Sequence, residues 1–288
     1  MRKIKIILEM IKFEHTVFAL PFAFLGAVLG SMLINGGWPP LIDWLWITLA
    51  MVGARSAAMS LNRVIDAKID KENPRTAERA IPAGLLSVSE TILFIVVSFF
   101  VLILAAYQLN MLAVYLLPIA VFFLVFYSYT KRFTWACHLF LGITIGLAPL
   151  GGWVAATGTL TWEAMVLFAA VALWTAGFDV IYATQDAEYD KDVKLHSIPS
   201  RFGIARALTF ARVFHIISFT AMLVLILITP LGWIYLTGTI AVGVIMVYEH
   251  SLVSPNDLSK VSVAFFTMNG IISILMLVFT IGDLLITA

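Results

Sequence analysis

The sequence predicts an all-α, polytopic membrane protein with nine transmembrane helices. Hydrophobic residues make up 61% of the 288 and charged residues only 12%, and soluble domains of this size do not have such a composition. Apolar segments long enough to cross a bilayer recur along the whole chain. Lys and Arg are confined to alternate loops, as the positive-inside rule requires. We therefore expect a single membrane domain over residues 1–288.

The nine expected helices follow one another with polar breaks between them. An α-helix needs about 20 apolar residues to cross the hydrocarbon layer. Eight crossings are the alternative, if one apolar stretch only lies in the interface. The expected spans are residues 16–34, 43–62, 88–107, 111–130, 135–156, 163–184, 207–229, 232–250 and 262–286.

The distribution of basic residues orients these spans. With the amino terminus in the cytoplasm, all eighteen Lys and Arg fall on the cytoplasmic side or within two helical turns of it. The opposite loops contain none, and an error of one helix would destroy this asymmetry. We therefore expect a multi-pass protein of the cell membrane. Its two long cytoplasmic loops, 63–87 and 185–206, are expected to form short helices that cap a cavity.

An acidic segment follows the second expected helix. Asn62, Asp66 and Asp70 are spaced by four residues and therefore share one helix face. Arg55 precedes Asn62 by two helical turns, about 10 Å inside the apolar span. A carboxylate after a membrane helix is often only a solvated loop edge, which explains Asp70 alone. It does not explain a buried arginine, which is expected to face a cavity or an anion.

A second acidic segment follows the sixth expected helix. Asp179, Tyr182, Asp186 and Asp190 fall within about 80° of one another on a helix, whereas Glu188 points away. Asp179 lies deep enough to be costly unless it lines a polar cavity. Clustered acids repel one another unless a cation joins them, so two facing acidic rows indicate magnesium. Magnesium in such sites usually accompanies a phosphate-bearing substrate.

Basic side chains accompany both acidic segments. Cytoplasmic loops contain such residues simply because basic residues orient a membrane protein. Some of them can also bind the phosphate oxygens that magnesium leaves free. Metal-binding acids, phosphate-binding cations and an apolar interior together suit a diphosphate with a long hydrocarbon tail. A dry cavity lined by Phe, Tyr and Trp would shield a carbocation from water. The candidate phosphate ligands are Lys68, Arg75, Arg79, Lys131, Arg132 and, beside the second acidic row, Lys191.

Small residues are concentrated between Gly142 and Gly152. Close helix packing is one explanation, because small residues let helix backbones approach each other in a membrane. A groove for a slender lipid chain is the other, and the two are compatible.

Four motifs in this order resemble the UbiA family of intramembrane prenyltransferases over essentially the full length of the chain. Each motif is short alone, but in this order and at expected helix ends they are specific. They are Asn62-x3-Asp66-x3-Asp70; Asn73-Pro-Arg75-Thr76-x2-Arg79-x-Ile-Pro82-x-Gly84; Tyr127-x-Tyr129-Thr-Lys131-Arg132; and Asp179-x2-Tyr182-Ala-x2-Asp186-x3-Asp190-Lys191-Asp192-x3-His196-Ser197-Ile-Pro.

The resemblance implies helices around a central cavity, two magnesium ions, a polyprenyl diphosphate donor and an aromatic acceptor. Carried over by position, Asn62, Asp66 and Asp70 hold one ion, and Asp186 and Asp190 hold the other. The remaining catalytic and substrate-binding roles are also hypotheses. Asp179 orients the site or deprotonates the acceptor, Arg55 binds the acceptor carboxylate, and the Tyr127 ring stabilises the carbocation.

The acceptor is the least determined part of this prediction. The chain looks most like the 4-hydroxybenzoate polyprenyltransferases of ubiquinone and menaquinone biosynthesis, yet Arg63 follows Asn62 where those members commonly have Asp. This variant resembles a subgroup that serves menaquinone synthesis through 1,4-dihydroxy-6-naphthoate. A tetrapyrrole or glycerol phosphate acceptor is a further alternative. A transporter of another class would place acids near the bilayer centre rather than at one face.

Overall fold

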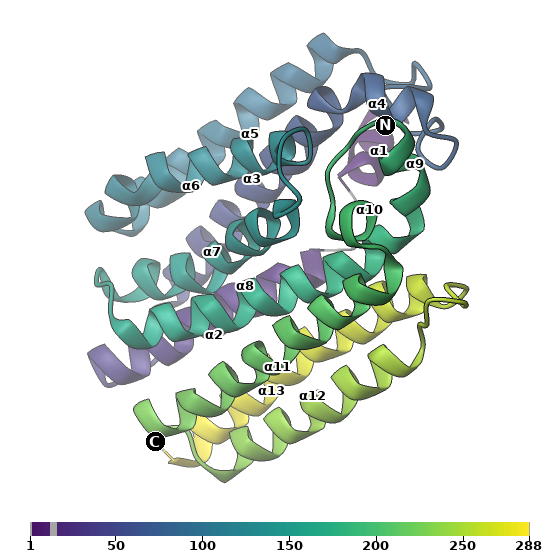
Figure 1. Cartoon of the computed structure of the whole chain (residues 1–288). Helices are drawn as coiled ribbons and strands as arrows, with labels where there is room; N and C mark the ends of the chain where they lie inside the picture. Colours follow the sequence, from purple (N-terminus) through teal and green to yellow (C-terminus); the bar gives the residue numbers. More distant parts are fainter. Residues whose placement is uncertain (1, 12–15, 288) are drawn as a thin grey trace.

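The computed structural model describes residues 2–11 and 16–287 and shows a bundle of long helices with no β-strand in those ranges (Figure 1). Each expected span corresponds to one long helix, with ends that differ by at most three residues, except that the first seven residues of the span 262–286 precede α13. These helices are α2 Thr16–Asn35, α3 Leu41–Ile65, α5 Val88–Leu109, α6 Met111–Thr130, α7 Cys137–Thr157, α8 Trp162–Ala183, α11 Ile204–Ile228, α12 Trp233–Ser251 and α13 Asn269–Thr287. A π-helical segment, Val263–Met268, leads into α13.

Seven helices of the described chain are long and apolar enough to cross a membrane. They correspond to α3, α5, α6, α7, α8, α11 and the segment that ends in α13. The all-α membrane fold is therefore confirmed. The nine crossings remain a prediction, because α2 and α12 do not belong to this set.

Helix α8 lies at the centre of one half of the bundle. Two thirds of its most apolar stretch is buried, and it packs between α7 and α11. Trp174 of α8 is fully buried and meets the rings of Phe22 and Phe178 at centroid distances of 5.1 and 4.9 Å. Helix α13 packs on α2 and closes this half of the bundle.

Small residues bring α7 close to both of its main neighbours. A Cβ at Gly142 would lie 2.2 Å from the carbonyl oxygen of Ala172 in α8. A Cβ at Gly152 would lie 1.9 Å from that of Ala23 in α2. Gly151 differs, because a Cβ there would meet nothing within 4 Å. Close packing is thus confirmed at Gly142 and Gly152. Gly151 lines an apolar cavity, and a groove for a lipid chain stays a prediction.

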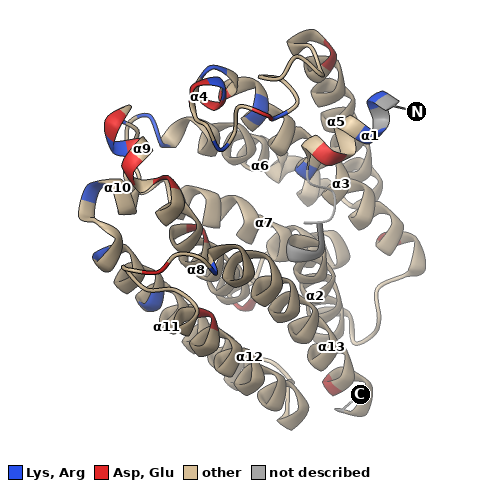
Figure 2. Cartoon of the chain, turned by 90° about the vertical axis from the view of Figure 1, so that its right-hand side faces the viewer, with Lys and Arg blue, Asp and Glu red and all other residues tan. Residues whose placement is uncertain are grey.

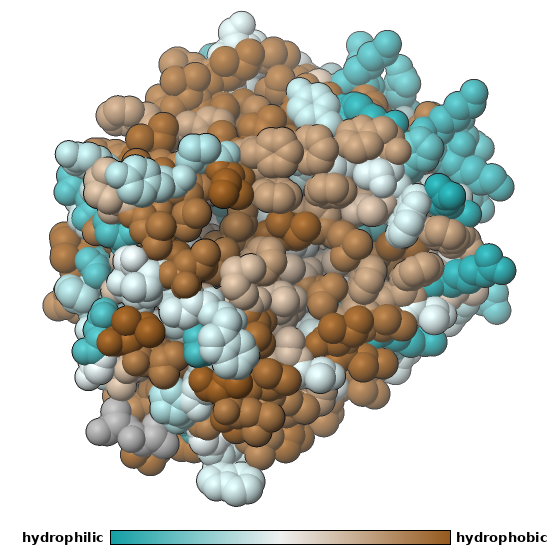
Figure 3. Space-filling model, turned by 60° about the vertical axis from the view of Figure 1, so that its left-hand side comes forward, coloured by the Kyte–Doolittle hydropathy of each residue, from teal (hydrophilic) through white to brown (hydrophobic). Residues whose placement is uncertain are grey.

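The other half of the bundle is more open. Helix α3 packs closely on α5, where Gly53 approaches the carbonyl oxygen of Ser98, but makes far fewer contacts with α6 and α7. Only 11% of the apolar stretch of α6 is buried. Apolar side chains dominate the face in Figure 3, and polar ones gather at its upper right edge. Lipid is the environment that such an exposed apolar surface requires.

Short helices and loops gather at one end of the bundle (Figures 1 and 2). They are α1 Arg2–Met10, α4 Ala67–Glu72, α9 Ala187–Asp192 and α10 Ile198–Phe202. The two long loops therefore do contain short helices, as the sequence predicts. Most Lys and Arg lie at this end, whereas Asp43, Glu163 and Asp283 belong to the helix turns at the other (Figure 2). In the first loop, Gly84 adopts φ +71°, a conformation that costs glycine little.

We predict that Gly152→Ala destabilises the protein by about 1–3 kcal/mol, because the new methyl group must displace the α2 backbone. Thermal unfolding of the purified protein in detergent measures the effect. The matched control is Gly151→Ala, for which we expect a change within about 0.5 kcal/mol. Equal melting temperatures for the two variants would contradict the close approach of α7 and α2.

Candidate active site

The first acidic segment runs from the end of α3 into α4, and its backbone keeps the helical hydrogen-bond pattern between the two helices. Helix α3 stops at Ile65 and Asp66 separates it from α4, so the helix is not continuous as the face argument assumes. The Asp66 amide still donates to Asn62 O (2.9 Å) and the Asp70 amide to Asp66 O (2.8 Å). This backbone pattern keeps Asn62, Asp66 and Asp70 at one cavity. The Asn62 side-chain amide also donates to Asp66 Oδ2 (3.0 Å).

The second acidic segment is also broken between two helices. A 3₁₀ turn, Thr184–Asp186, separates α8 from α9. Asp186 and Asp190 line the same cavity as the first segment, but Asp179 does not. The carboxylate of Asp179 instead lies 2.7 Å from Nδ1 of His138. The tight turn rotates α9 relative to α8, which an argument from one continuous helix does not foresee.

Contacts between the two loops bring the acidic segments together. Nε of Arg75, in the first loop, donates to Asp186 Oδ1 (2.8 Å), and a second guanidinium nitrogen bonds Asp186 Oδ2. The Asn73 side-chain amide lies 3.4 Å from Asp186 Oδ1. The Tyr189 hydroxyl donates to Ile69 O (3.2 Å). The expectation that the two segments face each other is thus met, although they are more than a hundred residues apart.

The resulting polar cavity has a volume of about 160 Å³. Its lining combines carboxylates, amides and basic groups from α3, α4, both long loops and the end of α6. Asn73, Thr76 and Tyr189 were not among the predicted site residues, and Asn73 and Thr76 lie within the motif that includes Arg75. The lining residues are Asn62, Asp66, Ile69, Asp70, Asn73, Arg75, Thr76, Arg79, Lys131, Asp186, Tyr189, Asp190 and Leu195.

Basic side chains neutralise three of the four cavity aspartates. Asp66, only 1% exposed, pairs with Lys131 (2.5 Å) and with Arg132 (2.8 Å). Arg79 contacts both Asp70 oxygens, at 2.7 and 2.8 Å. Such buried carboxylates would repel one another strongly without these cations.

The remaining two aspartates differ from each other in their partners. Arg75 pairs with Asp186. Burial lowers the pKa of Arg75, but the hydrogen bond and charge of Asp186 outweigh burial, so this pKa is raised overall. Asp190 makes no ion pair with any residue that the structure describes. The cavity therefore has one carboxylate available without first breaking an ion pair.

Several predicted site residues lie outside the polar cavity. Lys68 and Lys191 are exposed and line neither cavity described here. Lys68 follows Asp66 by two residues, which turns it to the opposite helix face. Tyr182 instead accepts a hydrogen bond from Arg75 (3.1 Å) and packs on Phe265. Tyr182 therefore holds the Arg75 side chain in place and does not form part of the cavity wall.

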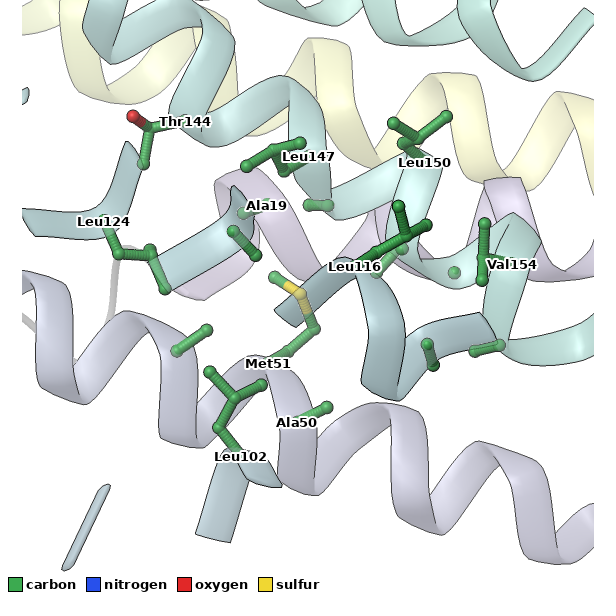
Figure 4. Close-up of a pocket in the computed structure, with 18 of the residues that line it drawn as sticks. Ala19, Ala50, Met51, Leu102, Leu116, Leu124, Thr144, Leu147, Leu150 and Val154 are labelled. Atoms are coloured by element: carbon green, nitrogen blue, oxygen red, sulfur yellow. The ribbon is translucent and has the colours of Figure 1, made fainter. Parts of the chain in front are cut away.

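A second, apolar cavity of about 370 Å³ lies along α3 beneath the polar one. Arg55 and Tyr127 line it, as do aliphatic side chains of α2, α3, α5, α6 and α7. Figure 4 shows Met51, Leu116 and Leu150 around this space. Tyr127 is the one aromatic group among the described lining residues, so the expected lining of Phe, Tyr and Trp is wrong. An aliphatic wall excludes water equally well.

Arg55 is the polar group of this apolar cavity. Its Nε is buried and has no hydrogen-bond partner in the described part of the chain. Tyr127 lies nearby and donates its hydroxyl proton to Ala58 O (3.2 Å). Arg55 lies two helical turns, about 10 Å, from Asn62 of the polar cavity. A buried guanidinium with an unused donor is a binding group for an anion that enters from the polar side.

The donor set of the polar cavity fits magnesium. Within residues 2–11 and 16–287, no three His, Cys, Asp or Glu side chains are grouped closely enough to hold an ion by themselves. Magnesium rarely uses such an all-protein cage, because it binds one or two carboxylates and completes its shell with water and phosphate oxygens. The four aspartates and Asn62 supply oxygen ligands of this kind. A phosphate-bearing ligand would complete the shell.

Comparison with known proteins gives a consistent result. The model of the UbiA prenyltransferase family matches residues 19–271. A 4-hydroxybenzoate octaprenyltransferase of Vibrio vulnificus is 30% identical over 223 residues, which cover 73% of this chain and 75% of that protein. One of Shewanella woodyi is 27% identical over 242 residues, covering 84% of each.

Solved structures share the fold. The apo structure of a UbiA homolog from Aeropyrum pernix K1 has a TM-score of 0.84 and 31% identity, and the match covers 94% of this chain and 98% of that one. A UbiA homolog from Archaeoglobus fulgidus, bound to GPP and Mg²⁺, has a TM-score of 0.76 and 19% identity, with coverage of 97% and 99%. The second similarity concerns the fold alone.

We predict that the neighbours Lys131 and Arg132 differ in their effect on stability. Arg132 also donates to Ser128 O (2.7 Å) and Ile65 O (3.0 Å), whereas the Lys131 ammonium contacts only Asp66 among the described residues. Arg132→Met should therefore cost about 1–3 kcal/mol of unfolding free energy. Lys131→Met should cost less than Arg132→Met, because Arg132 still neutralises Asp66 in that variant. Thermal unfolding in detergent compares the two, and a larger loss for Lys131→Met would contradict this assignment.

Proposed function

Because the chain belongs to the UbiA prenyltransferase family, we propose that it transfers a polyprenyl group from polyprenyl diphosphate to an aromatic acid in quinone biosynthesis. The observation that carries this proposal is the placement of the two cavities. A polar cavity with acids and cations adjoins an apolar cavity along α3. A diphosphate head and a hydrocarbon tail are the two halves of a substrate that suits them.

In the proposed complex, the diphosphate lies in the polar cavity. Asn62, Asp66 and Asp70 hold one magnesium ion, and Asp186 and Asp190 hold the other. Bound magnesium neutralises the diphosphate and so lowers the barrier to its departure from the allylic carbon. The GPP and Mg²⁺ bound to the Archaeoglobus fulgidus homolog support this proposal.

The basic residues exchange partners when the donor binds. Arg75, Arg79 and Lys131 are paired with cavity aspartates. When the aspartates bind metal, these three side chains are released to donate to phosphate oxygens. They then stabilise the negative charge that collects on the departing diphosphate as the carbon–oxygen bond breaks.

The apolar cavity protects the carbocation that remains. Its aliphatic walls exclude water, so an aromatic carbon of the acceptor is the nucleophile within reach. The face of the Tyr127 ring stabilises the cation electrostatically. A new carbon–carbon bond forms, and the ring carbon then loses its proton to the departing diphosphate. Of the two roles predicted for Asp179, its bond to His138 favours orientation of the site over deprotonation of the acceptor.

Arg55 is the proposed ligand of the acceptor carboxylate. Its unused donor faces the position where a small aromatic acid would approach the prenyl carbon. The relatives named 4-hydroxybenzoate octaprenyltransferase support an acid of this type. Arg63 beside Asn62 keeps 1,4-dihydroxy-6-naphthoate as the alternative acceptor, followed by a tetrapyrrole or a glycerol phosphate.

The distribution of charge supports the proposed orientation in the cell membrane. Most Lys and Arg lie at the end that contains the polar cavity (Figure 2), and the positive-inside rule assigns such an end to the cytoplasm. The four cavity aspartates also lie at this end rather than at the bilayer centre, which argues against an ion-coupled transporter.

A direct assay separates these alternatives. Membranes containing the protein are mixed with magnesium, a polyprenyl diphosphate and either 4-hydroxybenzoate or 1,4-dihydroxy-6-naphthoate. Mass spectrometry identifies the acid that gains the prenyl group, and diphosphate release is measured in parallel. A transporter would release no diphosphate, and that result would refute the proposal.

We predict that Asp66→Ala and Asp186→Ala each lower the rate of product formation more than about 100-fold, since each loses several kcal/mol of transition-state stabilisation. The amount of membrane-inserted protein should not change. Glu188→Ala is the control, because Glu188 is exposed and lies outside the polar cavity. Retention of more than about a tenth of the activity in both aspartate variants would refute the two-metal assignment.

We also predict that Arg55→Ala raises the KM for the acceptor far more than the KM for the donor. A charged hydrogen bond to the acceptor is worth about 1.5–3 kcal/mol, so the acceptor KM should rise about tenfold or more. Steady-state kinetics with each substrate varied in turn measures both constants. A larger change in the donor KM would assign Arg55 to the diphosphate or the tail.

A further inference from the structure

His138 is a buried histidine at the start of α7 that lines neither cavity. Its side chain is 3% exposed. Nδ1 lies 2.7 Å from Asp179 Oδ2 in α8. On the other side of the ring, Nε2 lies 3.2 Å from the backbone nitrogen of Ile198. The imidazole therefore connects two membrane helices to the loop that follows the second acidic segment.

The partners determine which ring nitrogen bears the proton. A backbone amide can only donate, so Nε2 must present a lone pair to Ile198. The proton of the neutral ring is then on Nδ1, where it is donated to the Asp179 carboxylate. Asp179 thus fixes the tautomer and the orientation of His138. Paired carboxylates and histidines orient ligand groups in the same way around many metal sites.

The segment that His138 holds is attached at successive residues. The His196 amide donates to Lys131 O (2.7 Å), and Cys137 Sγ lies 3.4 Å from His196 O. Ile198, fully buried, then donates to His138. Lys131 is also the residue whose ammonium pairs with Asp66. The segment is therefore fixed against the same end of α6 that contacts the first acidic segment.

The same segment contacts Asp190 directly. The Leu195 amide donates to Asp190 O (2.8 Å). Ser197, two residues after Leu195, caps α10. A shift of Ile198 would therefore move Leu195 and, with it, the backbone of the aspartate that has no ion-pair partner of its own.

We propose that His138 is a positioning residue, which with Asp179 locks the segment 195–198 so that Asp190 faces the first acidic segment. It touches neither substrate nor metal, and it acts through Ile198 and Leu195. The inference rests on the proposed function in one respect, namely that Asp190 serves a magnesium–diphosphate complex. The network itself depends only on the contacts described above.

Three variants test this proposal. His138→Leu fills the site but leaves the Ile198 amide without an acceptor. His138→Gln retains one donor and one acceptor on a planar group and should restore the contact. Asp179→Asn keeps the shape of the side chain, but its amide can donate to Nδ1 of His138. The ring proton then moves to Nε2, where it faces the backbone N–H of Ile198 and the hydrogen bond is lost. The control is His196→Leu, because the side chain of His196 is exposed.

Two measurements on the full-length protein in lipid nanodiscs report on the proposal. The first is hydrogen exchange of the backbone amides at 195–198 without any ligand. The second is a titration of magnesium in the presence of inorganic diphosphate, followed by the rise in melting temperature. It gives the magnesium concentration at which half of the maximal rise is reached. We expect faster exchange and a magnesium requirement about tenfold higher or more in His138→Leu and Asp179→Asn. His138→Gln should stay within about threefold of the unchanged protein, as should His196→Leu.

Kinetics then separate positioning from a general loss of structure. With saturating magnesium, the KM for the acceptor should be unchanged in His138→Leu, because Arg55 lines the apolar cavity and this loop borders the polar one. Unchanged exchange and magnesium dependence in both His138→Leu and Asp179→Asn would overturn the proposal. If His138→Leu fails to fold, Asp179→Asn and His138→Gln decide the result alone. Absence of prenyl transfer by the unchanged protein would refute the proposed function, whereas the exchange result would still test the network.

Discussion

The structure depends on the neutralisation of aspartates that lie nearly buried at one end of a membrane bundle. Clustered carboxylates in such a place are unfavourable unless cations accompany them. Three of these acids pair with basic residues that lie elsewhere in the chain. Asp66 pairs with Lys131 at the end of α6, and Asp70 and Asp186 pair with two arginines of the first long loop. These pairs hold the loops over the end of the bundle and create the polar cavity. The charges that shape the cavity are also those that a metal–diphosphate complex would engage.

The apolar cavity arises from unequal helix packing. Glycines on one side of α7 draw it against α2 and α8, where the backbones almost touch. On its other side, Gly151 leaves space, and α3 and α6 pack less closely on α7 than α2 and α8 do. One helix therefore both closes half of the bundle and forms a wall of the cavity. Arg55 lies two turns of α3 from Asn62, so one helix supplies residues to both cavities.

The sequence predicts the long helices well, because hydropathy and length report directly on a membrane span. It also predicts that the two acidic segments meet, because both follow helices that end on the same side. Periodicity describes only the face of one helix, however, and says nothing about the element opposite. The bond between Asp179 and His138 joins residues 41 positions apart, and the 3₁₀ turn Thr184–Asp186 interrupts the helix between Asp179 and Asp190. Lys68 was assigned by charge alone, and its helix face excludes it from the cavity.

The central claim is that the two acidic segments jointly bind divalent ions at the mouth of the apolar cavity. Anomalous diffraction from crystals grown with Mn²⁺ and a non-cleavable prenyl diphosphate analogue tests it most directly. The account predicts anomalous peaks between the Asp66–Asp70 and Asp186–Asp190 segments, with the prenyl tail along Met51 and Leu116. Manganese bound elsewhere, or a tail that lies outside the apolar cavity, would contradict it.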